Sequence, residues 1–384
     1  MNIPEEFNEI RPYEEEEYSQ VISTLQKDRE LTESLRSAIG VIPTKLLLFK
    51  VRRAGSIHCL QRDVIVPLIL KTLRHSRSVL SSDLSALPSV TGNWLFISNH
   101  RDIVMDSALL DCILIKNSGI GVEIAIGDNL LAKPWIQQSV KLNRSFIVRR
   151  SLPPVEFLEF SKTLSAYIRF AITTKQVPVW IAQREGRAKD SDDRTQKSLL
   201  KMLTMSDNSD IVESIRSLHL VPLSISYEYD PCDWLKAREF QLKRDNPDYR
   251  KSREEDLLNM KTGIFGHKGH VHYQAAECID SQLDNIDRTR PKNAQLEQIA
   301  EIIDRSIHAG YMIYPGNRVA LDLLHGDNSQ SGLYTEKDKA VFEQYMESRL
   351  QKIDIPDPDW DFLRTKFLEM YANPLINQIK ATAK

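Results

Sequence analysis

A chain of 384 residues with 41% hydrophobic and 27% charged side chains has the composition of a globular protein that buries a large core. The formal net charge of −2 argues against a dedicated nucleic-acid-binding protein, because such domains are usually strongly basic. Four widely separated cysteines fit neither a zinc site nor a disulfide framework, and no segment approaches eighteen consecutive apolar residues. We therefore expect a cytoplasmic protein that is neither secreted nor membrane-spanning.

The first predicted part of the chain, residues 1–85, is a helical N-terminal region. Between residues 18 and 82 apolar side chains recur at three- and four-residue spacing, which favours helices over strands. Residues 45–53 and 63–77 combine an apolar face with positive charge, as in helices that touch anionic lipid. Helices that pack on a neighbouring domain with solvated cations show the same pattern. An anionic membrane surface is the expected partner, with the protein peripheral on the inner face of the cytoplasmic membrane.

The second predicted part, residues 86–285, alternates short β-rich runs with helical stretches. This alternation indicates an α/β fold in which helices cover a sheet. Ligand sites of such folds gather in the loops that follow the carboxyl ends of the strands. The predicted strands are residues 94–98, 145–150, 177–182 and 220–229, and the predicted helices include residues 105–116 and 154–174.

The third predicted part, residues 286–384, returns to helical periodicity and is expected to be a helical C-terminal region. Pro356 and Pro358 interrupt its last two helical segments.

The strand at residues 94–98 leads into Asn99 and His100, and two acidic residues, Asp102 and Asp106, precede the next apolar helix. A carboxylate beside a histidine holds the ring in one tautomer and leaves the second nitrogen free to take a proton from a hydroxyl. No Gly-x-Ser-x-Gly turn or catalytic cysteine signature supplies a nucleophile. We therefore expect His100 to be a general base that activates a substrate hydroxyl for attack on a thioester carbonyl.

Basic residues lie at the end of the next predicted strand and just after the strand that follows it. Arginine side chains at strand ends present planar, multi-donor forks that suit phosphate, and a neighbouring glycine lets the backbone approach closely. Each arginine taken singly also fits a solvated surface charge. The candidate substrate-binding residues are Arg149, Arg150, Glu185, Gly186, Arg187 and Lys189.

The order of these segments resembles the glycerol-phosphate and lysophosphatidate acyltransferase superfamily. Four blocks carry the resemblance, over roughly residues 91 to 230: Asn99-His100 with a downstream Asp, Phe146-Ile147-Val148-Arg149, Glu185-Gly186-Arg187 and Val221-Pro222-Leu223-Ser224-Ile225. The resemblance implies a central mixed sheet covered by helices. It also implies that His100 is the base, that an Asp orients it, and that the second and third blocks bind the acceptor phosphate.

Two departures from the superfamily pattern leave residue roles open. Five residues, where the superfamily usually has four, separate His100 from Asp106, and Asp102 lies nearer; Asp106 is preferred because the apolar stretch after it matches the superfamily's following helix. The third block lacks the usual Pro-Glu-Gly-Thr-Arg order, so either Arg187 or Lys189 would meet the phosphate.

The reaction implied by the resemblance moves a fatty acyl group from acyl-CoA or acyl carrier protein to a hydroxyl of a lysophosphatidate-like glycerophosphate, in phospholipid biosynthesis. The acyl thioester is the donor substrate, the lysophospholipid or glycerophosphate is the acceptor, and no cofactor or metal is expected. Alternatives are acylation of glycerol-3-phosphate or an amino-acid lipid, and a non-catalytic, lipid-binding membrane scaffold. His267, His270 and His272 invite a metal hypothesis, but alternation along a strand puts only two of them on one face.

Overall fold

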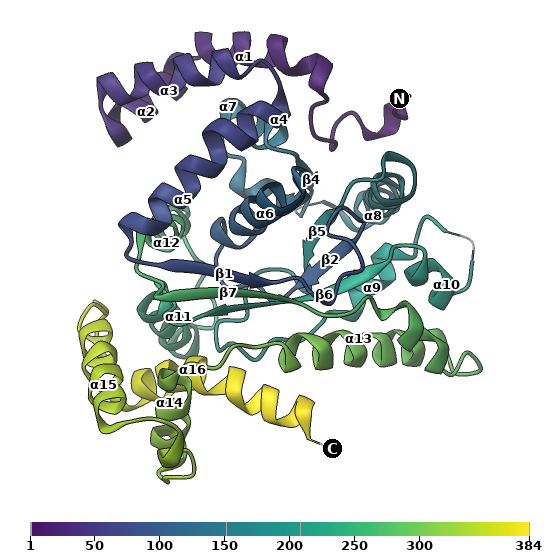
Figure 1. The fold of residues 1–384 in the computed structure, drawn as a ribbon. Coiled ribbons are helices and arrows are strands. Elements are labelled where there is room, and N and C mark those ends of the chain that lie inside the picture. Colours follow the sequence, from purple (N-terminus) through teal and green to yellow (C-terminus); the bar gives the residue numbers. More distant parts are fainter. Residues whose placement is uncertain (1, 151, 208, 384) are drawn as a thin grey trace.

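The computed structural model describes residues 2–150, 152–207 and 209–383, without the side chains of residues 38 and 39. In the described residues, seven strands form one sheet in the order β1-β7-β6-β2-β5-β3-β4 (Figure 1). Strands β6 and β7 pair antiparallel, and the other neighbours pair parallel. The predicted α/β fold with a central mixed sheet is therefore confirmed. The strands are β1 (Val79–Asp83), β2 (Leu95–Ser98), β3 (Glu123–Gly127), β4 (Ser145–Val148), β5 (Val179–Ala182), β6 (Leu220–Tyr227) and β7 (His270–Ala275).

Helices surround the sheet and also form both end regions of the chain. Gly55 and Gly119 end α3 and α6 at φ of 75° and 74°, a left-handed conformation that glycine adopts without steric cost. The α-helices are α1 (Tyr18–Lys27), α2 (Arg29–Ile39), α3 (Val41–Ala54), α4 (Ile57–Leu60), α5 (Val66–His75), α6 (Met105–Ser118), α7 (Pro134–Leu142), α8 (Pro154–Phe170), α9 (Lys197–Leu203), α10 (Ile211–Arg216), α11 (Asp233–Asp245), α12 (Arg253–Phe265), α13 (Lys292–Ala309), α14 (Pro315–His325), α15 (Glu336–Leu350) and α16 (Trp360–Thr382). Shorter helical turns are η1 (Glu5–Phe7), η2 (Glu15–Glu17), η3 (Gln61–Ile65), η4 (Asp128–Leu130), η5 (Ala171–Lys175), η6 (Ile279–Asn285) and η7 (Ser331–Leu333).

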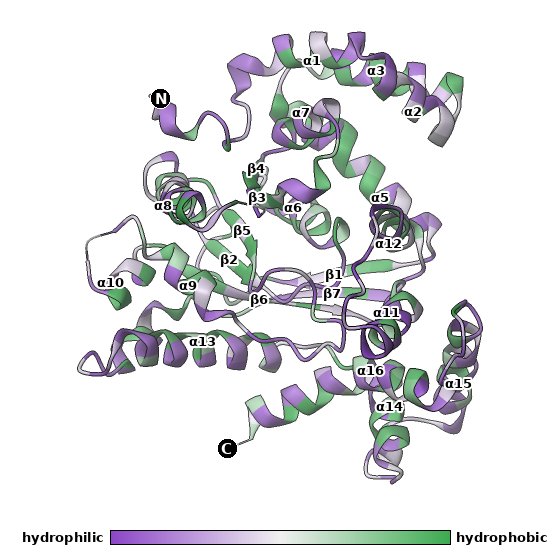
Figure 2. Ribbon diagram, turned by 180° about the vertical axis from the view of Figure 1, so that it is seen from behind, coloured by the Kyte–Doolittle hydropathy of each residue, from purple (hydrophilic) through white to green (hydrophobic). Residues whose placement is uncertain are grey.

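Alternating side chains of the central strands build a core on each face of the sheet. Leu95 and Ile97 of β2 face a core formed with α8, α9, α10 and α13, whereas Phe96 faces a core formed with α5 and α6. Figure 2 shows β2 and β5 in hydrophobic colours at the centre of the molecule. Because both faces are covered, these strands are near-continuous apolar runs, which is why the sequence identified them.

The N-terminal helices form a small core of their own with α7, and the C-terminal helices α14, α15 and α16 form another with α11. The two groups lie at opposite ends of the molecule (Figure 1). Residues 3–13 lie against the sheet edge: the Ile147 amide of β4 donates to the Ile10 carbonyl at 3.0 Å, and Phe7 and Ile10 are buried in the main core. The edge strand is thus covered by a segment that lies far away in the sequence.

Strands β1, β3 and β7 lie outside the four predicted strand runs, although alternation along a strand was considered for the histidines of β7. Residues 79–82 were expected to continue the helical pattern, but they belong to β1, which pairs parallel with β7 at the sheet edge. This strand reads Val-Leu-Ser-Ser-Asp and Val79 is 65% exposed, so it lacks the apolar run that marks the buried central strands. Strand β3 was not predicted either; it begins with the charged Glu123, whose buried carboxylate accepts from Lys175 at 2.7 Å. The division at residues 85 and 285 stays a prediction, and β1 joins the sheet although it precedes residue 86.

Within the described ranges, no helix combines the length and the apolar character needed to cross a membrane.

Candidate active site

The turn after β2 is held rigidly against both neighbouring strands. The Asn99 side chain donates to the Ile225 carbonyl at 2.9 Å and accepts from the Ile225 amide at 2.8 Å, which continues the β2 to β6 pairing by one position. On the other side, the Gln183 amide donates to the Ser98 carbonyl at 2.8 Å. The next residue, His100, therefore leaves the sheet at its carboxyl edge from a fixed point.

The partly exposed His100 and the buried Asp106 form a pair at this edge. The Nδ1 atom of His100 lies 2.8 Å from Oδ2 of Asp106, and the same oxygen accepts the backbone amides of Arg101 at 2.6 Å and Asp102 at 3.0 Å. Since Asp106 is fully buried in the first turn of α6, its carboxylate cannot turn away to solvent. With Nδ1 donating to this carboxylate, Nε2 carries the lone pair and is the proton acceptor. The ring stands edge-on to Trp180, 5.8 Å between centroids.

Asp102, the other candidate partner of His100, instead accepts backbone amides where α6 begins. Its Oδ1 accepts the amides of Val104 at 2.9 Å and Met105 at 2.8 Å. Burial, with the nearby Asp106 carboxylate, raises the pKa of Asp102. The structure therefore places Asp106 against His100 and Asp102 against the backbone amides that lead into α6.

Arg187 follows β5, the strand next to β2 in the sheet. Its Nη2 donates to Asn259 at 3.1 Å, and its buried Nη1 has no partner among the described residues. Burial opposes the charge of this side chain, but the neighbouring Cys232 and Asp230 favour it, and the net effect raises the pKa of Arg187. Gly186 before it has φ of 67° and open space where a Cβ would stand. This turn thus presents a guanidinium with an unused donor beside the β2 edge.

The other predicted phosphate residues are more dispersed. Arg149 makes an ion pair with the exposed Glu9, and its guanidinium lies 5.9 Å from the Phe160 ring centroid. In the sheet, β5 and β3 separate β2 from β4, so the carboxyl ends of β2 and β4 are about 14 Å apart at 4.8 Å per strand. The structure therefore does not bring Arg149 to His100.

Arg150 and Glu185 face each other at 3.9 Å and connect the turns after β4 and β5. Lys189 makes an ion pair with Glu239 of α11. Each of these cations already has an acidic partner. Of the six predicted substrate-binding residues, Arg187 thus stands out by its buried Nη1 atom, which has no partner in the described part of the chain.

A buried ion pair that was not predicted begins at the residue after His100. Arg101 lies 2.8 Å from Asp193, which also accepts from the Tyr311 hydroxyl at 2.7 Å. Gln183, fully buried after β5, has no partner for either side-chain amide atom in the described part of the chain. The position of Arg101 directly after His100 was the available signal. Its partner comes from a loop that no local pattern connects to it.

Three buried guanidinium nitrogens around this edge lack partners among the residues described: Nη1 of Arg101, Nε of Arg184 and Nη1 of Arg187. All three follow β2 or β5. Unused buried donors on cations are costly without an acceptor, and an anionic group is the acceptor that satisfies them best. This edge thus combines an imidazole held by a carboxylate with three guanidinium nitrogens that lack partners.

The three clustered histidines do not converge. Nε2 of His270 and Nδ1 of His272 lie 2.6 and 2.7 Å from the Ser81 hydroxyl, on one face of the sheet as predicted. His267 points elsewhere, with Nδ1 at 2.8 Å from the Ser76 carbonyl. A cavity of about 540 Å³ beside His272 lies between β7 and the end of α13, and its lining does not include His100.

No family model matches this chain, and no curated protein matches it. Among solved structures, one similar chain is the 1-acyl-sn-glycerophosphate (LPA) acyltransferase PlsC from Thermotoga maritima. The two share 10% identity with a TM-score of 0.37, over 73% of this chain and 92% of that one.

Proposed function

We propose that this protein is an O-acyltransferase that moves a fatty acyl group from an acyl-CoA or acyl carrier protein thioester to a hydroxyl of a lysophosphatidate-like glycerophosphate. The observation that carries the proposal is the contact between Nδ1 of the partly exposed His100 and Oδ2 of the buried Asp106, together with the unused donor of Arg187 in the turn after the neighbouring strand. A single base and an anion site at one sheet edge suit an acceptor that carries both a hydroxyl and a phosphate.

In the proposed reaction, Nε2 of His100 takes the proton of the acceptor hydroxyl as its oxygen attacks the thioester carbonyl. The tetrahedral intermediate carries the negative charge on the former carbonyl oxygen. Its collapse breaks the carbon–sulfur bond, the thiolate leaves, and the imidazolium returns the proton to the sulfur. The products are an ester and a free thiol. Asp106 stabilises the imidazolium between the two proton transfers, because its buried carboxylate remains within hydrogen-bonding distance of Nδ1.

The acceptor phosphate is assigned to Arg187, with Arg101 and Arg184 as neighbouring donors. A buried guanidinium of this kind binds a phosphate bidentately, so Arg187→Lys is expected to raise the KM for the acceptor more than it lowers kcat. Arg149→Lys is the matched control, since its guanidinium is already paired with Glu9 at the far edge of the sheet. Equal KM effects of the two substitutions would move the phosphate assignment away from Arg187.

Helix α3 is the proposed membrane contact. Ile42, Leu46 and Phe49 lie on one face at helical spacing and are at least 55% exposed. The exposed cations Lys45, Lys50, Arg52 and Arg53 lie on the same helix. Apolar side chains flanked by cations are the pattern of helices that lie in an anionic lipid interface. Such a contact brings the site to the surface where an acyl acceptor of this class resides.

The proposal is tested by release of free thiol from palmitoyl-CoA, with and without lysophosphatidate, by wild-type protein and by His100→Ala. His325→Ala, which changes an exposed histidine of α14, is the matched control. We expect acceptor-dependent release by the wild type and the control, and a loss of about 10²- to 10⁴-fold in His100→Ala, the range that a positioned base contributes.

Activity retained by a folded His100→Ala variant would refute the mechanism. If wild-type protein releases no thiol, the assay is repeated with acyl carrier protein as the donor carrier and with glycerol-3-phosphate and amino-acid lipids as acceptors. If no combination of donor and acceptor releases thiol and the protein binds anionic vesicles, a lipid-binding scaffold becomes the proposed function.

A further inference from the structure

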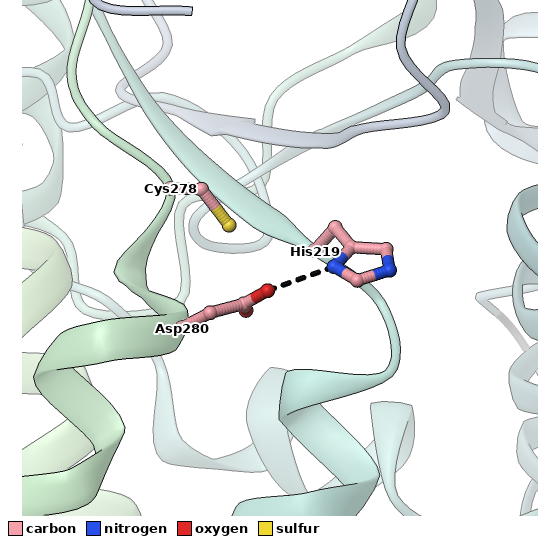
Figure 3. Close-up of side chains that lie close together, drawn as sticks. All are labelled: His219, Cys278 and Asp280. Atoms are coloured by element: carbon pink, nitrogen blue, oxygen red, sulfur yellow. Dashed lines mark hydrogen bonds and ion pairs between the residues drawn. The ribbon is translucent and has the colours of Figure 1, made fainter. Parts of the chain in front are cut away.

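A second cluster of reactive side chains lies away from His100. His219, Cys278 and Asp280 each offer one ligand atom, and these atoms lie within 4.8 Å of one another (Figure 3). His219 directly precedes β6, and the other two residues follow β7, which runs antiparallel to β6. The cluster therefore lies at the amino ends of the parallel strands, the edge of the sheet opposite to His100. We infer that His219, Cys278 and Asp280 bind a divalent transition-metal ion of the Zn²⁺ class.

The direction of the imidazole favours a metal over a catalytic Cys-His-Asp triad. A triad needs one ring nitrogen toward the carboxylate and the other toward the thiol. Here Nδ1 of His219 lies 2.8 Å from Oδ2 of Asp280, and Figure 3 shows that this same nitrogen faces Cys278 while Nε2 points away. One nitrogen, one sulfur and one oxygen thus converge on a common point. Convergence of this kind suits a shared cation.

The donor set suits zinc. Nitrogen, sulfur and carboxylate oxygen are the three ligand types that Zn²⁺ takes, and three protein ligands with one open position make a four-coordinate site. Bond lengths of about 2.0–2.3 Å put tetrahedral ligand atoms about 3.5 Å apart, so side-chain rotation closes the present spacing. Hard cations such as Mg²⁺ prefer oxygen-only sites, and the thiol disfavours them.

Two further observations fit a cation at this point. Oδ1 of Asp280 is buried and has no hydrogen-bond partner in the described residues, so an acceptor is already desolvated there. The side chains of His219 and Asp280 are 45% and 28% exposed, which gives an ion a path from solvent. His219 also holds a left-handed backbone with φ of 47°, the conformation that turns its ring toward the segment after β7.

The surrounding charges leave the site net acidic. Arg216 donates to the Asp280 carbonyl oxygen and is itself paired with Asp284 at 2.7 Å and with Glu213 at 3.3 Å. Burial and the Asp280 carboxylate raise the pKa of the Cys278 thiol to about 12. Metal binding must therefore displace the thiol proton to solvent, forming the metal–sulfur bond as the sulfur–hydrogen bond breaks. An ion bound here ties the start of β6 to the segment after β7.

The test uses full-length protein that has been treated with a chelator and dialysed. Co²⁺ replaces Zn²⁺ as a spectroscopic probe, because thiolate ligation gives a charge-transfer absorption in the near ultraviolet. We expect one equivalent of Co²⁺ to bind with this absorption and Zn²⁺ to displace it. Cys278→Ser should abolish the absorption, and His219→Gln should weaken Co²⁺ binding by at least about tenfold, the loss that even outer partners of a metal cause.

Cys59→Ser is the matched control, since Cys59 is a partly exposed free cysteine in the N-terminal region. It should bind Co²⁺ and Zn²⁺ as the wild type does. Zn²⁺ should also raise the Tm of the wild type and the control but not that of Cys278→Ser, because an ion that binds only the folded state stabilises it by mass action. Wild-type protein without thiolate–Co²⁺ absorption would overturn the inference, as would an absorption that persists in Cys278→Ser. None of these readouts depends on acyl transfer.

Discussion

Replacing Asp106 by asparagine tests how the buried carboxylate acts on His100. One oxygen, Oδ2, accepts from Nδ1 of His100 and from the amides of Arg101 and Asp102, while Oδ1 accepts from no described group. An asparagine can therefore put its carbonyl oxygen in the place of Oδ2 and its amino group in the place of Oδ1. All three hydrogen bonds survive, and the histidine keeps its tautomer.

What Asp106→Asn removes is the negative charge opposite the imidazolium. A hydrogen bond to a charged group contributes about 1–2 kcal/mol more than one between neutral groups. At 1.36 kcal/mol per factor of ten, we expect kcat to fall about 5- to 30-fold. Asp106→Ala removes the acceptor itself and leaves three donors unpaired, so its rate should fall by most of the 10²–10⁴ that a positioned base supplies.

The assay is the initial rate of thiol release at saturating donor and acceptor, with urea denaturation as the check on folding. Asp102→Asn is the control, because it keeps the oxygen that accepts the backbone amides leading into α6 and does not touch His100. A loss in Asp106→Asn as large as that in Asp106→Ala would show that the tautomer is not preserved and would refute the reasoning.

Three further predictions concern stability and membrane binding. Burial raises the pKa of Asp111 to about 7, so the folded state holds a proton that the unfolded state loses near pH 4. The free energy of unfolding should therefore fall by up to about 4 kcal/mol as the pH rises from about 4 to 7. Urea denaturation of Asp111→Asn should show no such dependence on pH. Arg101→Met leaves the Asp193 carboxylate buried without its cation and should cost about 3–5 kcal/mol in urea denaturation; a cost under about 1 kcal/mol would contradict the contribution of this pair. Phe49→Glu on α3 removes an apolar contact with lipid and adds repulsion from anionic headgroups, together about 2–3 kcal/mol. Sedimentation with anionic vesicles should therefore show about 30- to 150-fold weaker binding. Leu333→Glu, at an equally exposed position near the C-terminal helices, should leave the binding unchanged.

The sequence located the central strands because both of their faces are buried, and it located the histidine because a polar turn interrupts an apolar run. The residues alone could not decide between Asp102 and Asp106, since both precede the apolar stretch of α6 by a few residues; the preference for Asp106 came from the resemblance to the superfamily. The choice depends on where α6 begins: Asp102 precedes its first residue and accepts that residue's amide, whereas Asp106 lies in its first turn. A prediction of the helix start to within one residue would have been needed.

The order of the strands in the sheet could not be predicted from the sequence either. Arg149 and Arg187 both follow β-rich runs, and their positions along the chain look equivalent. The structure puts β5 beside β2 and β4 at the far edge, because the unpredicted β3 lies between them. Strand β3 begins with the charged Glu123, which breaks the apolar pattern by which the other central strands were predicted. Its carboxylate can be buried because Lys175 and Tyr167, which are far from it in sequence, donate to it.

Residues 3–13 cover the edge of β4, a strand that is synthesised much later than they are. The β4 amide that donates to the Ile10 carbonyl is translated about 140 residues after Phe7 and Ile10. At usual rates of synthesis this delay is on the order of ten seconds. During that interval two apolar side chains have no native partner, and once β4 appears its edge is open until they return to it. Nascent chains paused before residue 145 should therefore bind holdase chaperones through this segment, and release should follow the synthesis of β4.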